Sequence, residues 1–167
     1  MKSTASLGNL DSRDKKQKLL QNLLKLKEEK ETNRLREFIP NPGFQDRFIR
    51  SLAKTRVVTC GNQGGKTHIG AVEHAWYALG EHPHKNIKTP NKGVIVTAKS
   101  FKDGIQDEIV PKLREVVGSK DISKIKNSPQ GIPSVIYWRS GSVTYLMSAE
   151  QDDIAFESKT LHHALGS

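Results

Sequence analysis

The spacing of hydrophobic positions changes along the chain, and each spacing predicts a different element. In residues 11–37, leucines recur among lysines and glutamates and give the segment one apolar side: Leu19, Leu20, Leu23, Leu24 and Leu26. This pattern is typical of a charged amphipathic helix. We expect this helix to pack on its own domain; the alternative is an arm that docks on a partner subunit.

Beyond Pro40, short apolar runs alternate with helical spacing. Residues 56–59 and 93–98 are rich in β-branched side chains and are predicted to be buried strands. A helix that ends at Gly80 is predicted between them from apolar residues three or four apart: Ile69, Val72, Ala75, Trp76 and Leu79. A further helix should follow Ser100, which forms a capping box with Asp103, and Pro111 should kink or restart it.

The remaining pattern completes an α/β domain. Residues 135–138 and 143–147 flank a turn at 139–142 and predict a β-hairpin. Because strands and helices alternate, we expect an α/β fold with a mainly parallel sheet. The chain then divides into residues 1–38, a polar N-terminus with the charged helix, and residues 39–167, the α/β domain.

Composition adds charge to this picture. The 167 residues can bury a core, and 27 Lys+Arg against 18 Asp+Glu give a formal charge of +9. Such a balance favours polyanions such as nucleic acid, although scattered lysines also fit a solvated surface. The single cysteine suggests a reducing compartment, and no apolar run approaches the roughly 20 residues of a membrane span, so we expect a soluble, intracellular protein without a membrane partner.

The strongest chemical signal is the run Cys-Gly-Asn-Gln-Gly-Gly-Lys-Thr at residues 60–67, between a predicted strand and a predicted helix. It matches the P-loop pattern except that Cys60 stands at the first glycine. Backbone N–H groups would surround the phosphates, Lys66 would reach the outer oxygens, and the Thr67 hydroxyl could ligate Mg²⁺. The sequence predicts a site for ATP and Mg²⁺, with Lys66 and Thr67 also catalytic, formed by Gly61, Asn62, Gln63, Gly64, Gly65, Lys66 and Thr67.

Gln45 is a candidate for the adenine base. Its amide can donate and accept together, as the N6 and N7 edge of adenine requires. The alternative is a surface glutamine beside a core aromatic residue.

Four spaced motifs together resemble a known family. Asn-Pro-Gly-Phe-Gln at residues 41–45, the P-loop, Gly-Ala-Val-Glu at 70–73 and Gly-Glu-His-Pro at 80–83 look like the ATPase domain of tailed-bacteriophage terminase large subunits. The resemblance covers about residues 15–163. It implies a P-loop NTPase fold, a contact between Gln45 and adenine, and a motor that uses ATP to move double-stranded DNA into a preformed capsid. It also implies a homo-oligomeric ring on the portal of the procapsid, a small terminase subunit as partner, and the host cytoplasm as location.

Two positions depart from the family pattern. Many members carry an arginine in the P-loop where this chain has Asn62, so arginine stabilisation would come from elsewhere, such as another subunit. Residues 161–165 resemble the strand that precedes the family's acidic pair, but Gly166 and Ser167 stand where the acids belong. We therefore expect an incomplete P-loop domain, weak hydrolysis by this chain alone, and no nuclease activity.

Two other classes of function stay open at this point. One is a different P-loop nucleotide-binding protein, such as a small kinase or a helicase-like fragment. The other is a noncatalytic protein that binds DNA or a partner through its basic surface and its leucine-bearing helix.

Overall fold

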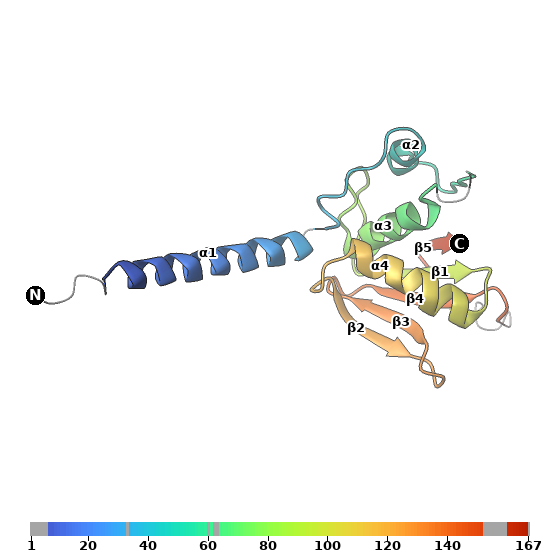
Figure 1. The fold of residues 1–167 in the computed structure, drawn as a ribbon. Coiled ribbons are helices and arrows are strands. Elements are labelled where there is room, and N and C mark those ends of the chain that lie inside the picture. Colours follow the sequence, from blue (N-terminus) through green and yellow to red (C-terminus); the bar gives the residue numbers. More distant parts are fainter. Residues whose placement is uncertain (1–6, 33, 60, 62–63, 152–159, 167) are drawn as a thin grey trace, which may run out of the picture.

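The computed structural model describes residues 7–32, 34–59, 61, 64–151 and 160–166. Figure 1 shows one long helix that leads into an α/β body. The described elements are the helices α1 (Leu7–Thr32), α2 (Phe44–Arg50), α3 (Lys66–Leu79) and α4 (Val110–Val116), the π-helix η1 (Phe101–Ile109), and the strands β1 (Lys92–Thr97), β2 (Ile122–Asn127), β3 (Pro133–Trp138), β4 (Val143–Ser148) and β5 (His163–Gly166).

The sheet is mixed, with strand order β2-β3-β4-β1-β5. β1 is parallel to β4 and to β5, whereas β3 is antiparallel to both β2 and β4. The α/β class and the β3–β4 hairpin are confirmed, and the expected parallel sheet is found in part: β1, β4 and β5 are parallel, whereas β3 makes the sheet mixed. Sequence analysis missed β2 because this edge strand is mostly polar, with only Ile122 and Ile125 packed against the core.

β1 is the strand that the long apolar run predicts, and it lies between two parallel neighbours. Gly93, Val94 and Ile95 are buried in succession. Successive side chains of a strand point to opposite faces, so burial without alternation means that both faces of β1 are covered. This prediction is confirmed.

The prediction of a strand at residues 56–59 is wrong. These residues belong to no strand, and the Val57 side chain is 82% exposed. The segment is anchored instead by one side chain: Arg56 donates to the carbonyl of Phe48 at 2.8 Å and pairs with Glu73 at 2.5 Å. A run of β-branched residues forms a strand only where a neighbouring strand pairs with it. The sequence of the run alone does not show whether such a neighbour is present.

The helices that follow the glycine-rich loop (residues 60–67) form the core with the sheet. Its largest fully buried side chains include Ile69 on α3, Ile105 on η1, Leu113 on α4 and Ile95 on β1. Pro111 lies in the first turn of α4, where its missing N–H costs no hydrogen bond, so the predicted restart of the helix is confirmed. Ser100 caps η1 by accepting from the Asp103 N–H at 3.1 Å.

α1 extends away from the body in Figure 1. Its leucine side chains are 54–61% exposed, so the expectation that they pack on their own domain is wrong. Glu28 pairs with Lys120 at 3.0 Å, but both side chains are about two-thirds exposed. In the described part of the chain, no helix has the length and apolar character that crossing a bilayer would need.

Candidate functional site

A cavity of about 440 Å³ opens beside the glycine-rich loop. Lys66 and Thr67 line it from the start of α3, Thr97 and Lys99 from the end of β1, and Gly166 from the end of β5. β1 and β5 are parallel, so the cavity lies at the carboxyl ends of two parallel strands. Open α/β sheets bind their ligands at this edge.

The loop leads directly into α3. Gly65 is the N-cap residue in the left-handed conformation, with φ of 78°. The first turn closes through the Ile69 N–H, which donates to the Gly65 carbonyl at 3.0 Å. The helix therefore starts at Lys66 and directs the positive end of its dipole toward the loop, an arrangement that favours anions.

Lys66 folds back over the loop. Its ammonium group donates to the Gly61 carbonyl at 2.9 Å, so the charge sits within the glycine-rich turn. Gly64 and Gly65 are also described, whereas Cys60, Asn62 and Gln63 lie outside the described residues. Three of the predicted phosphate contacts are thus placed beside Lys66 and Thr67.

Gln45 lies inside the body rather than on its surface. Its side chain is 3% exposed, and its Oε1 accepts from the Asn41 N–H at 2.8 Å. A Cβ at Gly65 would lie 2.8 Å from Gln45 Nε2, which places the amide directly against the loop. Gln45 therefore supports the loop. Its contact with adenine stays a prediction.

Two residues that sequence analysis missed complete the cavity. The Thr67 hydroxyl donates to Glu108 Oε1 at 3.5 Å, and Lys99 Nζ donates to Glu108 Oε2 at 2.6 Å. Glu108 comes from η1, 41 residues beyond Thr67. The hydrogen bond and charge of Glu108 raise the pKa of Lys99. The available signal for Lys99 was its place just after β1, where the carboxyl end of the strand meets the loop.

The backbone around Lys99 is held firmly. The Lys99 N–H donates to Thr97 Oγ1 at 3.2 Å, and the Ser148 hydroxyl donates to the Lys99 carbonyl at 2.8 Å. Thr97 and Ser148 are both buried. Hydrogen bonds therefore hold the backbone of Lys99 in place, although its side chain is 62% exposed.

A buried ion cluster around Glu73 of α3 includes Arg56, which also lines the cavity. Glu73 accepts from Lys85 at 2.8 Å and from His82 Nε2 at 2.9 Å, in addition to its pair with Arg56. Burial would raise the Glu73 pKa, but the hydrogen bonds from His82, Lys85 and Arg56 outweigh it and lower the pKa. The Arg56 guanidinium also lies 4.4 Å from the centre of the Phe48 ring. Arg56 thus ties the segment before the loop to α2 and α3.

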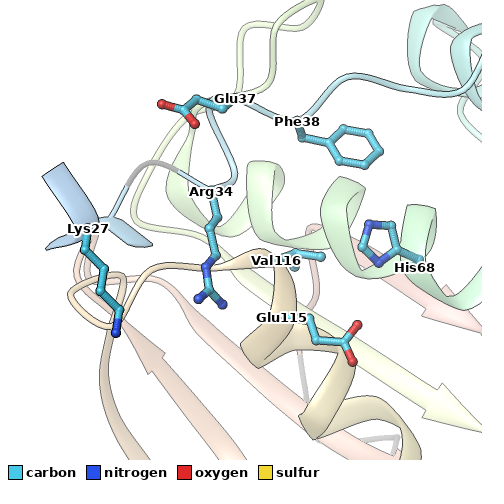
Figure 2. Close-up of a pocket in the computed structure, with 7 residues that line it drawn as sticks. All are labelled: Lys27, Arg34, Glu37, Phe38, His68, Glu115 and Val116. Atoms are coloured by element: carbon cyan, nitrogen blue, oxygen red, sulfur yellow. The ribbon is translucent and has the colours of Figure 1, made fainter. Parts of the chain in front are cut away.

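A second pocket, of about 460 Å³, is lined by α3 only at His68. Figure 2 shows Lys27 and Arg34 on the side of α1 and the turn that follows it, with the Phe38 and His68 rings across the pocket. Those rings are 5.6 Å apart between centroids. Glu37 and Glu115 also line this pocket, so its walls carry both signs of charge and select no class of ligand.

Comparison of the chain with protein-family models, curated proteins and solved structures finds no match. Chemically, the cavity brings together a helix N-terminus, two ammonium groups, a guanidinium, two hydroxyls and a carboxylate. This set suits a phosphate-bearing ligand that carries a divalent cation.

Proposed function

We propose that the chain binds ATP with Mg²⁺ in the cavity beside the glycine-rich loop. Lys66 and the backbone N–H groups of Gly61, Gly64 and Gly65 hold the outer phosphates, and the Thr67 hydroxyl ligates the metal. Asn62 and Gln63 belong to the same loop, and Gln45 lies near the adenine end. The triphosphate is matched by charge and by backbone donors rather than by shape.

One observation carries this proposal. The N-terminus of α3, with Lys66 and Thr67 in its first turn, meets the carboxyl ends of β1 and β5 at one cavity. Its volume of about 440 Å³ is in the range of small-molecule sites. A flexible surface turn with the same residues would have neither a helix start nor a strand edge beside it.

The cellular role that we propose rests on the four spaced motifs. On that basis the chain is the ATP-binding part of a terminase large subunit, which powers packaging of double-stranded DNA into a phage capsid. Its partners would be the DNA, a small terminase subunit, the portal and other copies in a ring. The net charge of +9 supports a DNA partner, because contacts to phosphates do not depend on base sequence.

Isothermal titration of ATP into the full chain with Mg²⁺ tests the binding site. Lys66→Ala removes a charge-assisted contact, and we expect affinity to fall by roughly 10-fold to 100-fold. Lys126→Ala is the matched control, because this exposed lysine on β2 carries the same charge at the far edge of the sheet. Equal ATP affinity of the Lys66→Ala chain and the unmodified chain would refute the proposed site.

A further inference from the structure

We propose that Glu108 is the carboxylate ligand of the Mg²⁺ ion that accompanies the nucleotide, beside Thr67. This inference rests on the proposed function and adds to it a metal ligand from η1. None of the sequence motifs includes Glu108, and only the folded chain brings it to the glycine-rich loop.

The distance between Glu108 and Thr67 suits two ligands of one metal ion. Glu108 Oε1 and Thr67 Oγ1 are 3.5 Å apart. Mg²⁺ binds six oxygens at 2.0–2.1 Å in an octahedron, so neighbouring ligand oxygens lie about 3 Å from each other. The two side chains need to approach by only a few tenths of an ångström to share one ion.

The oxygen atoms of Thr67 and Glu108 are of the kind that magnesium binds. Magnesium prefers hard oxygen ligands, and a hydroxyl with a carboxylate supplies two of them. In P-loop nucleotide-binding proteins the ion is held by the loop Ser or Thr together with an acidic residue. Among the residues that line the cavity, all within the described part of the chain, Glu108 is the acidic one.

The charge of Glu108 also favours a metal ion beside it when a nucleotide is bound. Glu108 faces a cavity in which the nucleotide phosphates would bring several negative charges, and like charges at close range repel. At present Lys99 neutralises the carboxylate at 2.6 Å. Because the Lys99 side chain is 62% exposed, its ammonium can turn toward a phosphate at little desolvation cost while the metal takes its place.

The position of Glu108 is fixed by packing. η1 lies so close to the end of β1 that a Cβ on Gly104 would collide with the Thr97 side chain. Gly104 and Ile105 are buried under this contact, and the Ser100 cap holds the start of the helix. The wide turns of η1 continue to Ile109, immediately after Glu108. Single π-helical segments occur often at functional sites.

The test measures ATP affinity of the full chain by calorimetry, with Mg²⁺ and with EDTA. For the unmodified chain we expect Mg²⁺ to strengthen binding about tenfold or more, and Glu108→Gln should abolish most of this gain, as expected for loss of a metal contact. In EDTA, Glu108→Gln should bind ATP as tightly as the unmodified chain or more tightly, because a repelling charge is gone. Glu115→Gln is the control, since this exposed residue on α4 pairs with Lys112 and lines the other pocket.

The outcomes separate the two proposals. If Mg²⁺ strengthens ATP binding by Glu108→Gln as much as it does for the unmodified chain, the metal role is overturned. Weaker ATP binding by Glu108→Gln both with Mg²⁺ and with EDTA would also overturn it, because that result would mark a purely structural residue. Loss of ATP turnover with an unchanged Mg²⁺ gain would assign Glu108 to the attacking water and would also overturn it. Absence of ATP binding in the unmodified chain, or binding insensitive to Lys66→Ala, would instead refute the proposed function.

Discussion

At the scale of single residues, the glycine-rich loop depends on the pairing of Gly65 with Gln45. Gly65 has a positive φ of 78°, and a side chain there would meet the Gln45 amide. That amide also holds the Asn41 N–H. The loop conformation is therefore set from both sides, by backbone freedom at Gly65 and by a buried hydrogen bond behind it.

Gly65→Ala should destabilise the chain for two separable reasons. The left-handed backbone costs about 1–2 kcal/mol for a residue with a Cβ. Displacing the Gln45 amide adds roughly 1 kcal/mol for a lost hydrogen bond. Chemical denaturation measures the sum as a change in the free energy of unfolding.

Gly131→Ala provides the control for that measurement. Gly131 has nearly the same φ, 80°, but a Cβ added there would meet no atom within 4 Å. We expect Gly65→Ala to cost about 1 kcal/mol more than Gly131→Ala, and the difference should vanish in a Gln45→Ala background. Equal costs of the two substitutions in the chain that retains Gln45 would mean that Gln45 does not support the loop.

Some residues of the candidate site could be predicted from the sequence, and others could not. Lys66 and Thr67 line the cavity as the motif predicts, because a glycine-rich loop before a helix has nearly fixed local geometry. Glu108 and Lys99 could not be found in this way. Their place depends on the distance between η1 and β1, which is set by the contact of Gly104 with Thr97 and not by any local pattern.

At the scale of elements, β5 is held to α3 by aromatic contacts. The His163 ring lies 4.5 Å from the His74 ring and 5.1 Å from the Tyr77 ring, between centroids. His74 Nε2 is 2.8 Å from Thr144 Oγ1, which also accepts from Trp138 Nε1. Ring packing thus connects β5 to α3, and polar contacts through Thr144 connect α3 to the hairpin.

This contact should make stability depend on pH. Burial and the nearby His162 charge lower the pKa of His163 to about 4, and burial lowers the pKa of His74 well below its usual value. Unfolded histidine titrates near 6.5, so below that pH the unfolded chain binds more protons than the folded chain. The stabilisation is complete above pH 6.5 and is lost as the pH falls toward 4.

Thermal unfolding at pH 7 and pH 5 measures this effect. From pH 7 to pH 5, the free energy of unfolding should fall by about 1–2 kcal/mol less in His163→Phe than in the unmodified chain. The reason is that one of the two histidines with a lowered pKa is gone. His84→Gln is the control, since His84 is exposed and makes no such contact with α3 and β5. An identical loss in His163→Phe and the unmodified chain would exclude His163 as a source of the pH dependence.

Elements differ in how well their sequences predict them. α3 and β1 were predictable because their burial follows the local pattern, and Gly80 ends α3 in the left-handed conformation with φ of 73°. β2 was not, because an edge strand with Lys124 and Lys126 exposed has no apolar period to detect. For residues 56–59 the error was the opposite one: their β-branched side chains predicted a strand, but these residues belong to no strand.

At the scale of the whole molecule, two of the cavities on the body have similar volumes but differ in their surroundings. The one in Figure 2 is bounded by α1, by residues 34–38, by His68 of α3 and by α4. The other is bounded by the glycine-rich loop and the carboxyl ends of β1 and β5. Size does not separate them. We propose the second as the nucleotide site because the start of α3 and the ends of two parallel strands lie beside it.

Hydrogen exchange of the full chain, with and without Mg-ATP, distinguishes the two cavities in one measurement. Binding at the proposed site should slow amide exchange in peptides that cover residues 64–67 and 97–99, because phosphates and metal order the loop and the turn after β1. Peptides that cover residues 34–38 and 115–116 should be unchanged. Protection confined to the pocket of Figure 2, or no protection at saturating ATP, would contradict a nucleotide site at the glycine-rich loop.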